Sequence, residues 1–315
     1  MPELPEAETI RRQLEREVLG RRITAARALT RRSVRRHRSC RDFAACVAGR
    51  KVTAVGRRGK AVILTLDDSR TLIIRLGMTG VIRVTPASEP RTKHTHVVLS
   101  LDDGRDLRFE DVRKFGEAHV TIGTAWEQIP DLAHYGPEPL SPQFTRAYLR
   151  AGLRRRPGKI KLALMDQKFI AGLGNIYTDE ALWRARVHPM RPGNSLTAPE
   201  VARLHRAIRA VLREAIARGG TSAKDETYRD VYGRPGYFRL DLAVYQRSGE
   251  PCPRCGAAIK RLPLGGRSTH FCPTCQPGAR MRVKGRRGAP PRAPAGAGLG
   301  RTQRSAPTIP GARGR

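Results

Sequence analysis

Hydrophobic residues near the start of the chain recur at helical spacing. Ile10, Leu14 and Val18 lie four residues apart within residues 5–18, and Arg and Glu occupy most positions between them. Residues four apart share one face of an α-helix, so this segment predicts an amphipathic helix.

The pattern changes between about residues 22 and 123, where short β-branched or alternating runs replace the helical spacing. These runs cover residues 52–55, 61–66, 71–74, 96–101 and 106–109. The turn sequence Asp102-Asp103-Gly104 separates the last two runs and predicts a β-hairpin. Many short strands behind one leading helix favour a β-sandwich or a barrel.

Helical spacing returns after a proline-rich stretch at residues 135–142, which predicts a stiff linker. Helices are expected at residues 159–167, 177–187 and 201–218. Gly172 and Gly174 precede the second of these helices and let the backbone approach another group closely. We expect Asn175 to cap that helix. The pattern predicts an α+β protein of two domains.

Charge narrows the class of binding partner. The 315 residues include 61 Lys and Arg but only 28 Asp and Glu, which gives a formal net charge of +33. Such an excess favours nucleic acid as the partner over an anionic membrane. The chain has no run of about 18 apolar residues and no apolar signal-like segment at its start, so we expect no membrane span and no secretion.

Residues 278–315 differ in composition from the rest of the chain. They contain ten Lys or Arg and no acidic residue, and Pro, Gly, Ala, Arg and Ser dominate. Such a segment cannot bury enough apolar surface to fold. We therefore expect a disordered basic tail that adds salt-sensitive affinity for nucleic acid.

The cysteines predict a metal site. Four of the six form two Cys-x-x-Cys pairs, namely Cys252, Cys255, Cys272 and Cys275. Two such pairs around a hairpin are typical of one Zn²⁺ held by four thiolates, which leaves no open position and makes the ion structural. Thiolate ligands also imply a reducing compartment. Cys40 and Cys46 lie in a helix-like stretch, where we expect small buried hydrophobic residues.

The first residues could carry chemistry. Once Met1 is removed, Pro2 has a secondary amine that can attack electrophilic carbon and form a Schiff base. Glu3 is then the nearest proton donor or acceptor. The alternative interpretation is an ordinary helix start, because proline and acidic residues both favour helix N-termini.

Three further features of the strand-rich half allow two interpretations each. Lys60 follows Arg57-Arg58-Gly59 and is either a catalytic or phosphate-binding ammonium or a solvated surface charge. Met78 occupies a glycine-flanked turn, where it either contacts a ligand or is partly buried. Arg113 and Phe115 either enter a base stack together or face solvent and core separately.

Together these residues resemble the bacterial formamidopyrimidine-DNA glycosylase family, whose members excise oxidised purines. The similarity covers about residues 2–276 in order and excludes the tail. It lies in residues 2–6, 76–80, 93–97, 111–116, 135–140, 172–177, 219–221 and 235–238 and in the four-cysteine ribbon.

The resemblance implies an N-terminal β-sandwich with a leading helix, followed by a helix–two-turn–helix region and a zinc ribbon. The expected divisions are a catalytic domain, a linker, a helical DNA-binding domain, the ribbon and the tail, at residues 1–130, 131–150, 151–240, 241–277 and 278–315. The implied protein is a monomer of the bacterial cytoplasm that acts on damaged double-stranded DNA.

The resemblance also implies the reaction. Pro2 would attack C1′ of a flipped nucleotide and Glu3 would transfer protons while 8-oxoguanine or a formamidopyrimidine leaves. Lys60 is matched to β-elimination and Arg267 to phosphate binding and δ-elimination, which together cleave the strand in base-excision repair. Flipping is required because the reacting atoms are inaccessible inside a stacked duplex.

Other matched residues would hold the DNA. Met78, Arg113 and Phe115 correspond to the residues that fill the gap left by the flipped nucleotide. Contacts to the DNA backbone are implied for His94, Arg156 and Asn175.

The sequence departs from the family at three positions, with Arg75 in place of His, Val112 in place of Pro and Lys114 in place of a second Arg. Two alternatives remain. Relatives of endonuclease VIII prefer oxidised pyrimidines, but Leu4 and the Met, Arg and Phe set favour the purine enzyme. A noncatalytic DNA-binding zinc protein would not require the combination of Pro2, Glu3 and Lys60.

Overall fold

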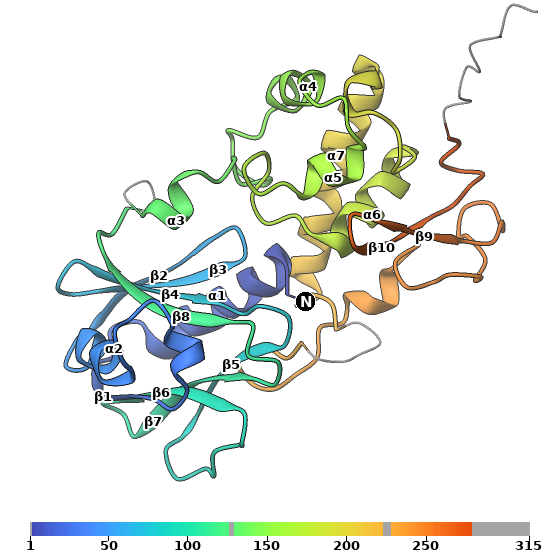
Figure 1. The fold of residues 1–315 in the computed structure, drawn as a ribbon. Helices are drawn as coiled ribbons and strands as arrows, with labels where there is room; N and C mark the ends of the chain where they lie inside the picture. Colours follow the sequence, from blue (N-terminus) through green and yellow to red (C-terminus); the bar gives the residue numbers. More distant parts are fainter. Residues whose placement is uncertain (1, 126–128, 223–227, 279–315) are drawn as a thin grey trace, which may run out of the picture. The chain divides into compact units, whose positions relative to one another are not determined.

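The computed structural model describes residues 2–125, 129–222 and 228–278 (Figure 1). The expected basic tail lies outside the described residues, apart from Gly278. Within the described part of the chain, no helix combines the length and the apolar character needed to cross a bilayer.

The predicted leading helix is confirmed as α1 (Leu4–Val18). Its apolar face is completely buried at Ile10, Leu14 and Val18, as the spacing indicated. The helix begins after Glu3, whose backbone N–H donates to Oε2 of Glu6 at 2.7 Å. A carboxylate three residues into a helix thus satisfies an amide that has no partner within the helix.

Two four-stranded antiparallel sheets form the N-terminal half and confirm the predicted sandwich. One sheet contains, in spatial order, β1 (Ile23–Ala28), β6 (Thr95–Leu101), β7 (Arg105–Asp111) and β5 (Gly80–Pro86). The other contains β2 (Val52–Arg58), β3 (Ala61–Leu66), β4 (Arg70–Arg75) and β8 (Glu117–Ile122). The predicted hairpin is β6–β7, where Leu99 lies opposite Leu107.

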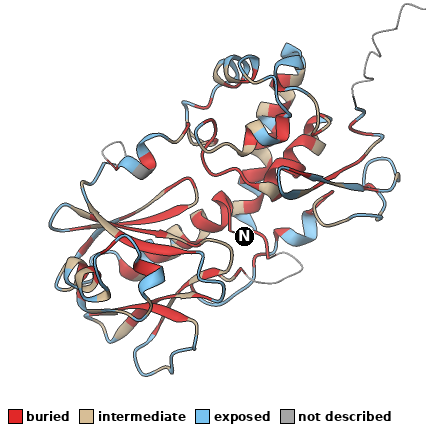
Figure 2. Ribbon diagram, in the orientation of Figure 1, coloured by how far each residue is buried: buried red, intermediate tan, exposed pale blue. Residues whose placement is uncertain are grey.

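The core of this half lies between the two sheets and α1 (Figure 2). Strands β3 and β4 are buried along nearly their whole length, which explains why their sequences are continuous apolar runs. A short 3₁₀ helix, η1 (Arg31–Val34), and α2 (Cys40–Val47) connect β1 to β2. Cys40 and Cys46 are half-buried in α2, and Cys40 packs against the core.

Helices dominate the second half. They are α3 (Pro130–Ala133), α4 (Arg146–Arg154), α5 (Ile160–Met165), α6 (Asn175–Ala185) and α7 (Ala198–Ala217), with short 3₁₀ helices η3 (Gly193–Ser195) and η4 (Phe238–Asp241). A second apolar core fills this half, and Leu4 of α1 belongs to it. The backbone N–H of Leu4 donates to the carbonyl of Gly172 at 3.1 Å, so the N-terminus is fixed against the helical half.

The chain then forms an antiparallel hairpin, β9 (Lys260–Leu264) and β10 (Arg267–Phe271), between the two Cys-x-x-Cys pairs. Lys260, Arg261 and Arg267 are exposed on it. His270, also on this hairpin, is only 4% exposed, and its backbone N–H donates to Asp179 at 2.8 Å.

Candidate active site

Pro2 and Lys60 line one pocket of about 220 Å³. Its wall contains residues of the β4–β5 turn and of the β7–β8 loop, and Tyr135 and Gln167 from the helical half. Pro2 is buried and Lys60 is half-buried. The structure therefore brings the predicted amine and ammonium together, and Lys60 is not a solvated surface charge.

Glu3 lies beside this pocket and caps α6. Its side chain accepts hydrogen bonds from the backbone N–H groups of Ile176 at 2.9 Å and Tyr177 at 3.4 Å. The expectation that Asn175 caps α6 is wrong: Gly174 is the N-cap residue, and the carboxylate comes from Glu3, 173 positions before Ile176. The Glu3 side chain thus lies at the positive end of the helix dipole.

Only glycine fits at position 174, because the side chains of Glu3 and Lys60 lie against its backbone. A Cβ atom at this position would lie 2.3 Å from Cδ of Glu3 and 2.7 Å from Nζ of Lys60. The close approach predicted for this glycine is thus an approach to the Glu3 carboxylate and the Lys60 ammonium.

The environment of Lys60 favours its neutral form. Partial burial lowers its pKa, the nearby Glu3 opposes that shift, and the positive charge of Arg267 adds to it. Arg267, at the start of β10, is therefore within electrostatic reach of Lys60 although the two belong to different halves of the chain.

Glu6 was missed by the sequence analysis. Its carboxylate, 1% exposed, accepts hydrogen bonds from the backbone N–H groups of Glu3 and Thr221, both at 2.7 Å, and from the hydroxyl of Tyr177. Burial raises the pKa of Glu6. The spacing of Glu3 and Glu6 is typical of a helix cap and could have identified Glu6. No sequence pattern indicated its two distant partners, Tyr177 and Thr221.

A second missed group is a completely buried ion pair. Nζ of Lys161 lies 2.7 Å from Oδ1 of Asp179, and both side chains are 0% exposed. Lys161 also donates to the carbonyl of Ser268 at 3.1 Å, next to Arg267. The pair thus joins α5 and α6 to the hairpin. A lysine in an amphipathic helix ordinarily indicates a solvated position, so the sequence carried no signal for it.

Met78, Arg113 and Phe115, the residues predicted to fill the gap left by a flipped nucleotide, lie on two loops that touch. We call these three the wedge residues, and the β7–β8 loop that carries Arg113 and Phe115 the wedge loop. Met78 is half-buried in the β4–β5 turn. Phe115 is 45% exposed on the β7–β8 loop, with the guanidinium of Arg113 4.8 Å from its ring centroid. Of the two interpretations of Phe115, the core-facing one is therefore wrong. A Cβ on Gly77 would lie 2.6 Å from the nitrogen of Gly116, which places the two loops in contact.

Asp111 fixes the shape of the β7–β8 loop. One carboxylate oxygen accepts the N–H of Arg113 at 3.2 Å, and the other accepts the N–H of Gly116 at 2.7 Å. The backbone N–H of Asp111 donates to the carbonyl of His94 at 3.0 Å. His94 is therefore next to the wedge loop.

The remaining predicted DNA contacts differ in availability. Asn175 is the first residue of α6 and adjoins the amides that bind Glu3. The guanidinium of Arg156 lies 4.0 Å from the ring centroid of Phe169 and 3.6 Å from Asp166, so it is already engaged within the protein.

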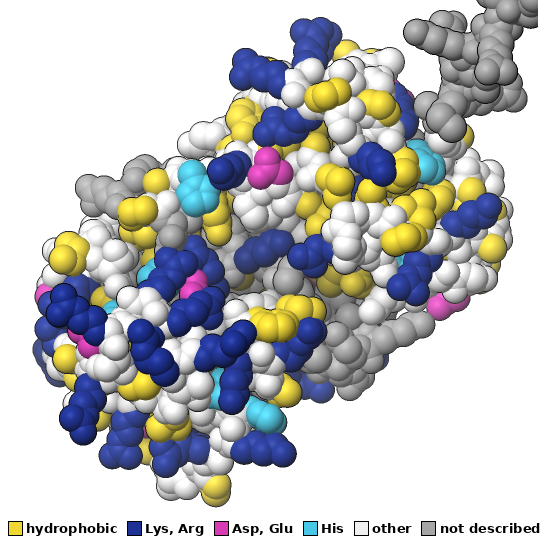
Figure 3. Space-filling view, viewed as in Figure 1, with side chains coloured by type: hydrophobic (Ala, Val, Ile, Leu, Met, Phe, Trp, Pro, Cys, Tyr) yellow, Lys and Arg dark blue, Asp and Glu magenta, His cyan; other side chains and the backbone are white. Residues whose placement is uncertain are grey.

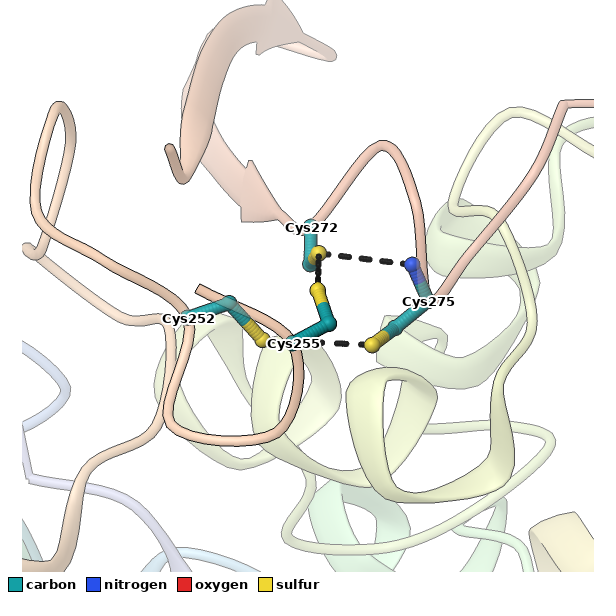
Figure 4. Close-up of side chains that lie close together, drawn as sticks. All are labelled: Cys252, Cys255, Cys272 and Cys275. Atoms are coloured by element: carbon teal, nitrogen blue, oxygen red, sulfur yellow. Dashed lines mark hydrogen bonds between the residues drawn. The ribbon is translucent and has the colours of Figure 1, made fainter. Parts of the chain in front are cut away.

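The four predicted cysteines converge at the base of the hairpin (Figure 4). The Sγ atoms are 3.9 Å apart for Cys252 and Cys275 and 3.5 Å apart for Cys255 and Cys272. A tetrahedral zinc with bonds of about 2.3 Å requires sulfurs roughly 3.8 Å apart, which these separations match. The cluster is a structural zinc site. The indole N–H of Trp183 donates to Sγ of Cys252 at 3.4 Å and connects α6 to it.

Positive charge covers much of the face shown in Figure 3. Lys and Arg side chains are spread over the sheets of the N-terminal half, and few acidic side chains accompany them there. A polyanion can therefore contact this face without strong repulsion.

Three family profiles match consecutive parts of the chain. Residues 1–118 match the formamidopyrimidine-DNA glycosylase N-terminal domain, residues 135–227 match its H2TH domain, and residues 249–278 match a zinc finger found in FPG and IleRS.

Curated proteins and solved structures agree with these matches. Formamidopyrimidine-DNA glycosylase of Herpetosiphon aurantiacus is 46% identical over 276 residues, which are 88% of this chain and 100% of that protein. The crystal structure of MutM (FPG) from Thermus thermophilus has a TM-score of 0.79 at 44% identity, over 87% of this chain and 98% of that one. The Lactococcus lactis Fpg in complex with DNA containing an abasic site gives a TM-score of 0.81 at 36% identity, over 88% and 100% of the two chains.

Proposed function

The chain belongs to the formamidopyrimidine-DNA glycosylase family, and we propose that it flips 8-oxoguanine and formamidopyrimidine nucleotides from duplex DNA and removes these bases. The observation that carries the proposal is the shared pocket of Pro2 and Lys60 with the Glu3 carboxylate beside it. Simple DNA binding has no need of an amine, an ammonium and a carboxylate at one point.

In the proposed reaction, the Pro2 nitrogen attacks C1′, the bond from C1′ to the base breaks, and the departing base takes up a proton. Glu3 transfers protons while the base leaves and the sugar ring opens. The resulting iminium acidifies the C2′ proton, so loss of that proton breaks the 3′ C–O bond by β-elimination. A second elimination releases the 5′ phosphate. The nucleophile thus couples base removal to strand cleavage.

Lys60 and Arg267 have complementary proposed roles. Because partial burial lowers the pKa of Lys60, more of its amine is neutral and able to accept a proton during β-elimination. The exposed position of Arg267 at the start of β10 suits its guanidinium to hold a phosphate during δ-elimination.

The wedge and backbone contacts support flipping. Met78, Arg113 and Phe115 fill the gap in the stack, and the contact between their two loops supports a common action. His94, Arg156 and Asn175 contact the DNA backbone, for which Arg156 must leave its position over Phe169.

We also propose that the enzyme acts as a monomer in a bacterial cytoplasm. The proposed divisions follow the sequence: a catalytic domain at 1–130, a linker at 131–150, a helical DNA-binding domain at 151–240, the zinc ribbon at 241–277 and the tail at 278–315.

Borohydride trapping on an 8-oxoguanine duplex tests the mechanism. We expect a covalent adduct that mass spectrometry locates at Pro2. A matched protein with an uncleavable N-terminal extension should bind the duplex but form no adduct. An adduct at another residue contradicts the role of Pro2, and faster excision of thymine glycol than of 8-oxoguanine contradicts the substrate assignment.

A further inference from the structure

Three arginines surround one buried carboxylate at the edge of the pocket that contains Pro2. Glu117 is the first residue of β8, and its side chain is 4% exposed. Its Oε2 atom accepts from Nη2 of Arg35 at 2.7 Å. Its Oε1 atom accepts from Arg36 and from Arg75, both at 3.0 Å.

The arginines reach solvent, whereas the carboxylate does not. The side chains of Arg35, Arg36 and Arg75 are 46%, 40% and 23% exposed. Arg35, Arg75 and Glu117 line the same pocket as Pro2. Three guanidinium groups facing one carboxylate leave an excess of positive charge at the pocket edge, where an incoming anion would meet it.

Glu117 is ionised at neutral pH. Burial alone would raise its pKa, but hydrogen bonds and charge from Arg36, Arg35 and Arg75 outweigh burial and lower the pKa below its usual value. The Glu117 carboxylate is therefore an anion that the three arginines already bind within the protein.

The segment that carries Arg35 and Arg36 also contacts the β7–β8 loop through hydrogen bonds. Nε of Arg32 donates to the carbonyl of Lys114 at 2.9 Å, and Nη1 of Arg35 donates to the carbonyl of Gly116 at 3.4 Å. Any anion that draws Arg35 away from Glu117 acts next to the loop that carries Phe115.

We infer that Glu117 is an internal counter-ion that competes with DNA phosphates for Arg35, Arg36 and Arg75 and thereby weakens the hold of the enzyme on the DNA backbone. The inference rests on the proposed function, because it takes duplex DNA as the incoming anion. Phosphate and carboxylate oxygens accept the same paired hydrogen bonds from guanidinium groups. Glu117 is a positioning residue, since it acts through the arginines.

The test compares binding of undamaged duplex by fluorescence anisotropy for the wild type, Glu117→Gln and a matched control, Glu214→Gln. Glu214 makes the same kind of paired contact with Arg184, at 2.7 and 2.6 Å, outside the pocket lining. Between about 50 and 200 mM salt, Glu117→Gln should steepen the slope of log affinity against log salt by about 0.9 for each additional phosphate that an arginine neutralises. At about 50 mM salt its affinity should rise roughly tenfold, while the control changes little.

Two further measurements separate competition from a loss of structure. Arg35→Gln should act in the opposite direction and give weaker binding with a shallower salt slope. Glu117→Asp, which retracts the carboxylate, should tighten binding to a smaller extent. In steady-state assays on 8-oxoguanine duplex, Glu117→Gln should lower both KM and kcat, because product release slows.

Unchanged or weaker duplex binding by a folded Glu117→Gln protein overturns the inference. If that variant does not fold, unchanged or weaker binding by Glu117→Asp overturns it instead. The proposed function fails separately, when the wild-type protein does not excise 8-oxoguanine. Wild-type excision together with an unaltered salt slope in Glu117→Gln refutes only the role of Glu117.

Discussion

The backbone N–H of Ile176 donates a 2.9 Å hydrogen bond to the carboxylate of Glu3. This bond connects the segment that carries the proposed nucleophile to the first turn of α6 in the other half of the chain. The carboxylate of Glu3 thus caps a helix, and it also lies close to Lys60. The helix-capping role of Glu3 and its proposed role as a proton carrier can be separated experimentally.

Glu3→Gln should reduce 8-oxoguanine excision by roughly 10²- to 10⁴-fold, because an amide cannot transfer the proton. Its melting temperature should change little, since the amide oxygen still accepts from Ile176. Glu3→Ala also removes the cap and should lose about 1 kcal/mol of stability in addition. Wild-type excision rates in Glu3→Gln would restrict Glu3 to a structural role.

Gly174→Ala should reduce excision by about 100-fold, because the added Cβ displaces Glu3 or Lys60 from the pocket. The measurement is single-turnover excision together with thermal melting. Gly158→Ala is the matched control, since a Cβ there meets no atom within 4 Å. Equal activity of the two variants would show that the Glu3 and Lys60 positions tolerate displacement.

Lys161→Ala should destabilise the fold by about 3–5 kcal/mol, because it leaves the buried Asp179 carboxylate without its ion-pair partner, with the hydrogen bond from His270 remaining. Urea denaturation measures this loss. Lys161→Met combined with Asp179→Asn removes both charges and should recover much of the stability. Arg11→Ala, which breaks a more exposed pair with Glu15, should change stability by less than about 1 kcal/mol. A loss for Lys161→Ala as small as that of Arg11→Ala would argue against this account.

Glu200 predicts a pH dependence of stability. Its hydrogen bond from Arg191, together with bonds from Thr197, lowers its pKa from 4.5 to about 2. A carboxyl group whose pKa is lowered in the folded state stabilises the fold at pH values above its pKa in the unfolded state. This contribution is lost as the pH falls towards its pKa in the folded state. Glu200→Gln should therefore melt at a lower temperature than the wild type at pH 7, and the difference should shrink between about pH 4.5 and pH 2. A difference independent of pH would assign the effect to packing.

Local sequence patterns predicted the fold class, many of its elements and the four clustered cysteines. The apolar runs of β3 and β4 and the helical spacing of α1 are local properties, and each was recovered nearly to the residue. Gly174 was also informative, because a glycine before a helix indicates close approach even when the approaching group is unknown.

Long-range pairings could not be predicted in the same way. Local propensity placed Asn175 as the cap of α6, but Glu3 from the other end of the chain overrides it. Lys161 and His270, from α5 and β10, both contact the buried Asp179, and neither contact has a local signal in the sequence. When the hydrogen-bond partners of a carboxylate are distant in the sequence, no short-range sequence pattern indicates them.

The placement of Leu4 in the helical core has a consequence for the order of events during synthesis. Residues 2–6 are made long before Gly172, Ile176 and Thr221, which hold them in place. The ribosome thus releases Pro2 early, but the residues that surround it in the folded protein are synthesised late. In a nascent chain the proposed nucleophile is therefore not yet held in place, and we expect catalytic competence only after the second half of the chain has folded around it.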